Sequence, residues 1–263
     1  MKIATYNVNS INARLENLVG YLDRDQPDIV LLQEIKTEFN AFPFFELQTR
    51  GYEAKVLGQK SYNGVAVLSR HKMRIILEGL PGFRDDSARY LEVEATIGGQ
   101  PYRVASIYLP NGNPPYNNSA DESKWIYKLS WMEALYQHAK SLLDLRQPII
   151  LGGDFNVILT DDDVYNPKNF LGNALFRPEV IQKLRAFSYL GYYDAWRMLH
   201  IKEIGYTFWD YADCSFANDM GMRIDYLWLN AYAADKLVSV EVDKEPRRRS
   251  KPSDHTVLKA ILD

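Results

Sequence analysis

Apolar and polar residues alternate in several short segments of the chain, and this pattern is typical of β-strands that bury one face. The clearest case is the segment 90–97 (YLEVEATI), in which an apolar side chain at every second position lies on one face. Gly98 and Gly99 follow it and predict a hairpin turn into a second strand at 101–108. By the same criteria, further strands are expected at 2–8, 28–33, 64–69, 148–155, 224–229 and 255–261.

Helix signals are fewer than strand signals. A first helix is expected after Asn12, its predicted N-cap, with these residues at helical spacing: Leu15, Leu18, Val19 and Leu22. A longer helix presents one apolar face, formed by Trp125, Leu129, Met132, Tyr136 and Leu143. A third helix is expected to start near Pro178, because proline is favoured in the first helical turn.

Many strands with a few helices between them predict an α/β fold, a layered sandwich in which helices cover two packed sheets. The stretches 110–123 and 160–173 are rich in Asn, Pro and Asp, and they predict long loops within the same domain. No repeat, low-complexity tract or Gly/Ser linker divides the chain, so we expect residues 1–263 to form a single domain.

The bulk composition, 46% hydrophobic and 25% charged, is that of an ordinary globular protein. Cys214 is the only cysteine, so no intramolecular disulfide can form, and a reducing compartment is favoured. We expect Cys214 to be buried as a small hydrophobic residue. No run approaches the roughly 20 apolar residues of a membrane span, and the first residues lack an apolar signal core. A cytoplasmic protein with no membrane partner is therefore expected.

The net charge of −3 means that any contact with nucleic acid would need a local basic patch. One candidate is the basic run Arg247, Arg248, Arg249 and Lys251. Such a run is as often a solvated loop, but its position just ahead of Asp254 favours phosphate binding.

Polar residues stand at the edges of several strand-like segments, where burying an unpaired carboxylate would be costly. These residues are Glu34, Asp154, Asn156, Asp225, Asp254 and His255. Their recurrence beside strands suggests one pocket at one end of a sheet. The set is rich in oxygen, contains one imidazole and no cysteine, and so suits a hard cation such as Mg²⁺.

Each of these residues also has a purely structural interpretation. Glu34 alone is typical of an exposed strand end, and Asp154 and Asn156 are typical of a turn after a strand. Asp225 lies inside RIDYLWL, where a turn is less expected, and an inward Asp could stabilise His255 as an imidazolium. Together the residues match the requirements of phosphodiester hydrolysis.

Eight strings give a more specific signal, and they occur in a fixed order: MKIATYNVNSINARL, PDIVLLQEIK, YNGVAVLS, YLPNGNP, GGDFNV, YTFWDY, GMRIDYLWL and KPSDH. With them the chain resembles the exonuclease III family of the exonuclease–endonuclease–phosphatase superfamily over essentially its whole length. The resemblance implies a four-layered α/β sandwich, with two packed mixed β-sheets flanked by helices (DNase I-like).

The resemblance also implies roles for individual residues. Glu34 would be the principal ligand of Mg²⁺, or of Mn²⁺ in its place, and these residues would assist at the metal: Asn7, Asp154, Asn156, Asp254 and His255. Asp154 would activate the attacking water, and Asn156 would orient the water or the phosphate. Asp225 would support His255, which would face the scissile phosphate together with Tyr108.

Further residues are implied in binding double-stranded DNA. Phe208, Trp209 and Met222 would form a small apolar pocket for a base-free sugar, although Phe208 could equally belong to the core. Some relatives carry Trp where this chain has Met222, which leaves open the balance between abasic-site cleavage and 3′-end trimming. Asn111 and Arg223 would contact DNA. From position in the sequence alone, and not from the resemblance, the long 160–176 loop with Lys168 and Arg177 is expected to insert at the DNA groove.

The function implied by the resemblance is that of a Mg²⁺-dependent DNA repair nuclease of base excision repair. It would act as a monomer on duplex DNA, as an abasic-site endonuclease, 3′-phosphodiesterase and 3′-to-5′ exonuclease. Two other functions remain to be compared: a phosphohydrolase of the same fold acting on an inositol phosphate or sphingolipid, and a nucleic-acid-binding module without activity.

Overall fold

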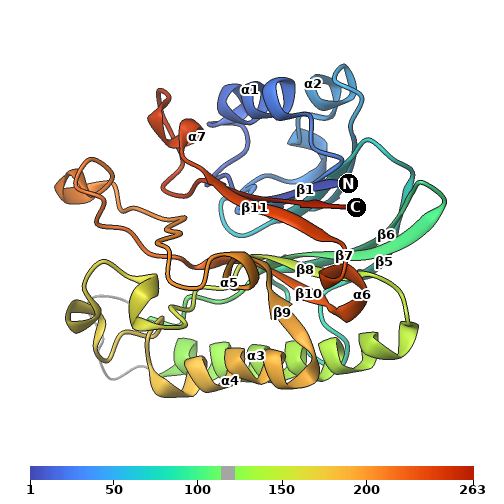
Figure 1. Ribbon diagram of the computed structural model, residues 1–263. Coiled ribbons are helices and arrows are strands. Elements are labelled where there is room, and N and C mark those ends of the chain that lie inside the picture. Colours follow the sequence, from blue (N-terminus) through green and yellow to red (C-terminus); the bar gives the residue numbers. More distant parts are fainter. Residues whose placement is uncertain (114–121) are drawn as a thin grey trace.

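Two six-stranded β-sheets packed face to face form the centre of the protein, and helices cover their outer faces (Figure 1). The computed structural model describes residues 1–113 and 122–263. In each sheet one central pair of strands is parallel and the other pairs are antiparallel, so both sheets are mixed. The expected layered α/β sandwich is thereby confirmed.

The first sheet has the order β11-β12-β1-β2-β4-β3. Its strands are β1 (Lys2–Asn7), β2 (Ile29–Gln33), β3 (Glu53–Leu57), β4 (Val65–Ser69), β11 (Leu237–Asp243) and β12 (Val257–Leu262). The second sheet has the order β5-β6-β7-β8-β10-β9. Its strands are β5 (Met73–Glu78), β6 (Tyr90–Ile97), β7 (Gln100–Tyr108), β8 (Ile149–Asp154), β9 (Tyr192–Asp194) and β10 (Asp225–Asn230).

The helices form the two outer layers of the sandwich. In Figure 1, α1 and α2 lie above the first sheet, and the long helices α3 and α4 lie below the second. The α-helices are α1 (Leu15–Asp25), α2 (Phe44–Gln48), α3 (Ser123–Leu142), α4 (Pro178–Leu190), α5 (Ala195–Leu199), α6 (Ala231–Ala234) and α7 (Glu245–Arg248). No helix in the described part of the chain is both long and apolar enough to cross a bilayer.

Three apolar layers hold this arrangement together. One lies between the sheets, and the other two lie between each sheet and its helices. Because the central strands are covered on both faces, all of the residues in β2, β4, β8 and β10 are buried. A strand end in this interior can therefore carry a polar side chain only where hydrogen-bonding or charged groups lie beside it.

The eight expected strands are confirmed, with ends that shift by one or two residues, and the expected hairpin joins β6 to β7. The strands that the pattern missed are β3, β5, β9 and β11. All four are the outermost strands of their sheets. An edge strand is half exposed and short of neighbours, so its alternation is weaker, as the mixed burial of β3 and β5 illustrates.

Three local expectations were wrong. Helix α1 begins after Arg14, and the side chain of Asn12 instead donates to Thr37 and to the carbonyl of Ala41. Leu143 lies in a short 3₁₀ turn just beyond α3. Cys214 is exposed, in a loop with left-handed backbone.

Two consecutive glycines allow β8 to pass between its neighbours in the second sheet. Gly153 has φ +151°, and a Cβ atom there would lie 1.9 Å from the carbonyl oxygen of Ile107 in β7. A Cβ atom on Gly152 would lie 2.6 Å from side-chain atoms of both Leu31 and Leu227. The strand that ends in Asp154 therefore requires glycine at both positions to keep its register.

Replacing Gly153 by alanine is expected to lower the free energy of unfolding by about 3 kcal/mol or more, since steric overlap and backbone strain add. Urea denaturation followed by circular dichroism measures the change. Gly99→Ala is the matched control: its φ is also positive, at +83°, but no atom lies within 4 Å of the added Cβ. A loss of about 1–2 kcal/mol is expected there. Equal losses in the two variants would contradict the steric account.

Candidate active site

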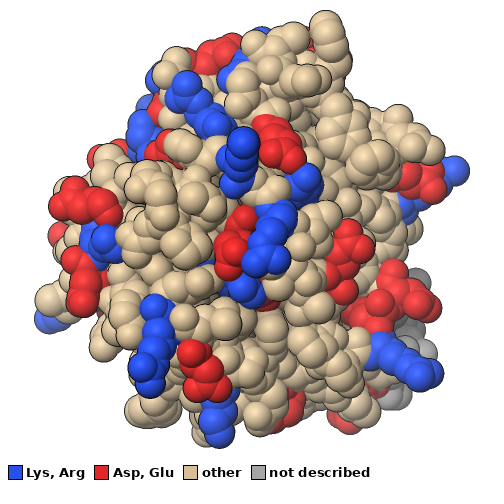
Figure 2. Space-filling view, turned by 90° about the vertical axis from the view of Figure 1, so that its right-hand side faces the viewer, with Lys and Arg blue, Asp and Glu red and all other residues tan. Residues whose placement is uncertain are grey.

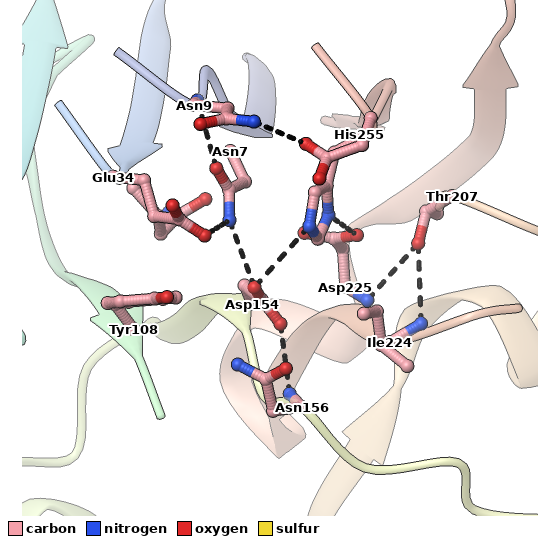
Figure 3. A network of polar contacts seen from close by, with 12 residues as sticks. Asn7, Asn9, Glu34, Tyr108, Asp154, Asn156, Thr207, Ile224, Asp225 and His255 are labelled. Atoms are coloured by element: carbon pink, nitrogen blue, oxygen red, sulfur yellow. Dashed lines mark hydrogen bonds and ion pairs between the residues drawn. The ribbon is translucent and has the colours of Figure 1, made fainter. Parts of the chain in front are cut away.

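The ends of six strands meet at one edge of the sandwich and carry polar side chains. The parallel pairs β1/β2 and β7/β8 end there, so Asn7 and Glu34 come from the first sheet and Tyr108 and Asp154 from the second. The antiparallel strands β10 and β12 begin at the same edge, which brings Asp225 opposite Asp154 and places His255 just ahead of β12. Figure 3 shows these side chains converging between the two sheets.

Asn7 links the two carboxylates of the site. Its amide nitrogen donates to Glu34 Oε1 at 2.8 Å and to Asp154 Oδ2 at 3.0 Å. The side-chain oxygen of Asn7, Oδ1, accepts from the backbone nitrogen of Asn9 at 3.1 Å. Two acids that would otherwise repel each other are thus held beside one neutral donor.

His255 lies between Asp154 and one further carboxylate, that of Asp225. Its Nδ1 is 2.8 Å from Asp225 Oδ2, and its Nε2 is 3.6 Å from Asp154 Oδ2. Thr207 fixes the strand beneath Asp225, because its hydroxyl accepts from the backbone nitrogens of Ile224 and Asp225 (Figure 3). All of these groups are buried, so their charges act on one another with little screening by water.

The pKa values reflect this burial. Burial raises the pKa of Asp154 to about 7, and the nearby charges of Asp225 and Glu34 add to the shift while His255 opposes it. Burial alone would lower the pKa of His255, but Asp225 and Asp154 outweigh it and raise that pKa to about 10. The imidazole is therefore a cation at neutral pH, next to an acid whose proton is easily exchanged.

Tyr108 and Glu34 face the same cluster. Burial, followed by the charges of Glu34 and Asp154, holds the pKa of Tyr108 well above its usual value, so its hydroxyl keeps its proton. Burial would raise the pKa of Glu34, but Lys36, Asn7 and His255 lower it below the ordinary range. Lys36 is 2.8 Å from Glu34 Oε2. Glu34 is thus an anion and Tyr108 a neutral hydrogen-bond donor.

Asp154 is the last residue of β8, and Asn156 lies beyond the strand. Asn156 is left-handed, with φ 47°, and its backbone nitrogen donates to Asp154 Oδ1 at 2.9 Å. The amide of Asn156 donates to the carbonyl of Leu109 at 2.9 Å and accepts from Asn111 at 3.3 Å. The two residues therefore form a turn after β8, as their purely structural interpretation predicted, and both also line the pocket.

The cluster lies at the base of a pocket of about 460 Å³. One part of its wall is apolar and is formed by these side chains: Tyr165, Phe170, Leu175, Phe208, Met220, Met222 and Ile224. The rest of the wall is polar and includes Asn113, Asn173, Asp210, Asp213 and Ser215. Phe208 packs edge-on against the imidazole of His255, with ring centroids 5.0 Å apart. A polar reaction centre thus adjoins an apolar wall that offers few hydrogen-bonding groups.

Two residues that the resemblance implied in DNA binding lie away from the pocket surface. The Trp209 side chain is fully buried, and its Nε1 donates to Asp219 at 3.1 Å. The Arg223 side chain is also fully buried, and it contacts Asp163 at 2.7 Å and Asp194 at 2.7 Å. Burial and internal partners remove both from the set available to contact a ligand.

The remaining predicted contacts are divided between surface and interior. Asn111 is exposed at the rim of the pocket, whereas Arg177 is half-buried and stacks on Trp125, 4.0 Å from the ring centroid.

In the basic run, Arg247 is buried and donates to the carbonyl of Trp209 at 2.8 Å. Arg249 pairs with Glu245 at 2.7 Å. The expected patch is therefore reduced mainly to Arg248 and Lys251, which are exposed.

Several contributors to the site were not identified from the sequence. Asn9 donates to Asp254 Oδ1 at 3.1 Å and accepts from Lys36, so it ties together the two segments that flank Glu34 and His255. Lys36 stands two residues after Glu34, and this spacing is the only feature of the sequence that could have identified it as a partner of Glu34. Thr207 carries no distinguishing pattern, because its role depends on a strand pairing between segments remote in the chain.

One group of side chains has the geometry to hold a metal ion. Ligand atoms of Glu34, Asp154 and His255 all lie within 4.8 Å of one another. Asp254 lines the same pocket but accepts from Asn9, and the oxygen of Asn7 points away from the carboxylates toward the backbone of Asn9. The structure thus brings three of the six predicted ligands into one group.

Comparison with known proteins agrees with this geometry. The Endonuclease/Exonuclease/phosphatase family matches residues 4–255. Exodeoxyribonuclease III of Haemophilus influenzae is 29% identical over 98% of both chains. Among solved structures, an AP endonuclease from Archaeoglobus fulgidus superposes with a TM-score of 0.91 and 32% identity, covering 100% of this chain and 99% of that one. The 3′-5′ exonuclease NExo from Neisseria meningitidis gives 0.91 and 34%, with 100% of both chains covered.

The chain belongs to the Endonuclease/Exonuclease/phosphatase family. Within that family it is an exodeoxyribonuclease III-like hydrolase with the DNase I-like fold, as its relatives and its two packed sheets show together.

The buried Arg223 is expected to support the wall of the pocket, because Asp163 belongs to the loop that lines it. Arg223→Met leaves two buried carboxylates without this cation, and we expect a loss of about 3–5 kcal/mol in the free energy of unfolding. Arg74→Met is the control, since Arg74 pairs with Glu94 at an exposed position and should cost less than about 1 kcal/mol. Urea titrations that give the same loss for both variants would refute the expectation.

Proposed function

We propose that this protein is a Mg²⁺-dependent DNA repair nuclease that hydrolyses phosphodiester bonds of duplex DNA. Its activities would be those of an abasic-site endonuclease, a 3′-phosphodiesterase and a 3′-to-5′ exonuclease in base excision repair. The observation that carries the proposal is the buried carboxylate–imidazole cluster at the base of a partly apolar pocket. Relatives support the choice of substrate: one is an AP endonuclease, and another is a Neisseria 3′ phosphatase bound to product DNA hairpin.

The donor set fits a hard divalent cation. Glu34 and Asp154 offer carboxylate oxygens, and we propose that Glu34 is the principal ligand. A nitrogen of His255 lies within the same 4.8 Å, but it could bind the ion only after the imidazolium loses its proton. Asp254 and Asn156 line the same pocket and would have to leave their present partners to assist, and Asn7 would need its amide turned. Mg²⁺, or Mn²⁺ in its place, would supply Lewis-acid stabilisation of charge on the phosphate.

The residues of the chain account for the remaining chemistry. Asp154, with its raised pKa, takes a proton from a water that attacks phosphorus in line with the departing O3′ or O5′ oxygen. The new P–O bond forms as the ester bond breaks, and the departing oxygen takes up a proton from solvent. The His255 imidazolium and the Tyr108 hydroxyl donate to the phosphate oxygens, where negative charge increases. Asn156 orients the water or the phosphate from the turn after β8.

The apolar wall is the basis for the proposed preference for damaged DNA. Phe208 and Met222 are half-buried beside His255 and contribute few hydrogen-bonding groups, so the pocket would accept a sugar without a base. We propose that Asn111 at the rim and Arg177 near it contact the phosphate backbone. Trp209 and Arg223 are left out of this set because they are buried.

The distribution of charge argues against DNA binding on the face opposite the pocket. The loops that line the pocket lie on the left of Figure 1. Figure 2 shows the right-hand side, where Lys and Arg are interspersed with Asp and Glu over the face seen. Such a face presents no continuous basic surface to a polyanion. We further propose that the chain acts as one domain, as a monomer, in the cytoplasm.

Cleavage of two duplexes in Mg²⁺ tests the proposal, one with an internal abasic analogue and one undamaged with a recessed 3′ end. We expect incision beside the analogue and shortening from the 3′ end. Asp154→Asn should lower kcat by about a thousandfold, since it removes the proposed general base. The control is Asp144→Asn, an exposed residue in the 3₁₀ turn after α3. If neither duplex is cut by the wild type, the substrate is a smaller phosphoester and the DNA proposal fails.

Calorimetric titration with Mg²⁺ and Mn²⁺ tests the metal site without DNA. Glu34→Gln should weaken binding at least about tenfold, because an anionic oxygen ligand is replaced by a neutral amide. Glu38→Gln serves as the control, since Glu38 is exposed and lies outside the cluster. Unchanged affinity in Glu34→Gln would place the ion elsewhere.

A further inference from the structure

One fully buried lysine lies behind the pocket and takes no part in the chemistry described above. Lys128 of α3 has no solvent-accessible surface. Its ammonium group donates to three backbone carbonyls, those of Asn156 at 2.6 Å, Asn111 at 3.0 Å and Ala174 at 3.0 Å. Burial lowers the pKa of this amine to about 7, but three carbonyl acceptors call for three N–H donors, which only the ammonium form supplies. Every donor of the ammonium is then satisfied by main chain alone.

The three carbonyls belong to three separate segments of the pocket wall. Asn111 follows β7, Asn156 follows β8, and Ala174 belongs to the loop ahead of α4. Each segment also supplies side chains that line the pocket: Asn111, Asn113, Asn156, Asn173 and Leu175. A single side chain from the outer helical layer thus connects three loops. Ala174 lies 18 residues after Asn156 and 63 residues after Asn111.

The loops close tightly around this side chain. Gly112 has φ +83°, and a Cβ atom there would lie 2.5 Å from Cδ of Lys128. Asn113 accepts from the backbone nitrogen of Ala174 at 3.0 Å, and Ile158 donates to the carbonyl of Leu175 at 2.7 Å. The glycine of the PNG string is therefore required by the stem of Lys128.

A buried lysine could simply be a satisfied core residue. Here, however, all three of its acceptors are backbone groups of pocket loops, and one belongs to Asn156 itself. We propose that Lys128 is a positioning residue of this active site, which fixes the backbone of Asn156 and Asn111 and so aligns their amides with the scissile phosphate. The alignment step rests on the proposed function, whereas the ordering of the three loops does not.

Hydrogen–deuterium exchange tests the ordering of the loops independently of any activity. In Lys128→Met, the backbone amides of 109–113, 155–159 and 173–176 should exchange at least about fivefold faster than in the wild type. Met132→Ala is the matched control, since Met132 lies one turn further along α3 in the apolar core. Exchange that stays unchanged in Lys128→Met, or rises equally in the control, would overturn the proposal.

A double-mutant cycle tests whether Lys128 acts through Asn156. With the abasic duplex, Lys128→Met should lower kcat at least about tenfold in the wild-type background but less than about twofold when Asn156→Ala is already present. Lys128→Arg, which keeps the charge and the donors, should recover most of the activity, and Met132→Ala should leave kcat near that of the wild type. Equal losses in both backgrounds would reduce Lys128 to a structural residue.

The outcomes separate this inference from the proposed function. If the wild type cuts neither duplex, the proposed function fails, and the exchange measurement still decides whether Lys128 orders the loops. If Lys128→Met does not fold, Lys128→Gln replaces it, since its amide keeps two donors and should give an intermediate increase in exchange. A Lys128→Gln variant with wild-type exchange in all three loops would overturn the inference.

Discussion

The contact between His255 and Asp225 is the interaction on which the site depends. A buried imidazolium is stable only if an anion lies beside it, and the 2.8 Å contact to Asp225 supplies one in the interior. The positive charge of His255 then allows Asp154 and Glu34 to share the same small volume, with Asn7 donating to both. Removal of any one member would leave the others uncompensated. The strand ends that carry them must therefore be held firmly in register.

Two other buried cations hold the walls of the pocket rather than its base. Arg223 joins the loop at Asp163 to Asp194 at the end of β9, and Lys128 joins three loops through their carbonyls. Loops of irregular structure leave backbone groups that need partners, and a buried cation can satisfy several of them at once. In the reaction centre and in the walls around it, buried charged and polar groups are thus stabilised in the same way, by pairing with one another instead of with water.

The sequence predicts much of this arrangement, and its failures have physical causes. Glu34, Asp154, Asp225 and His255 were recognised because a carboxylate or imidazole beside an apolar strand is unusual. Their recurrence beside strands suggested one pocket, but periodicity does not reveal the strand order that brings them together, and their individual roles came from the family resemblance. Arg223 was expected from the resemblance to contact DNA, but its guanidinium is buried and pairs with Asp163 and Asp194, partners that no local pattern in the sequence reveals. Lys128 gave no signal, since its partners are main-chain atoms of segments distant in the sequence.

The most direct test of the central claim is single-turnover incision of an abasic duplex by Asp225→Asn in Mg²⁺. Asp225 touches the imidazole of His255 but does not line the pocket, so its effect must pass through that imidazole. We expect a folded protein that binds Mg²⁺ within about threefold of the wild-type affinity but cuts at least about a hundredfold more slowly, because His255 loses its orienting anion. Incision at the wild-type rate would contradict the account, since it would show that the charge of His255 does not depend on Asp225.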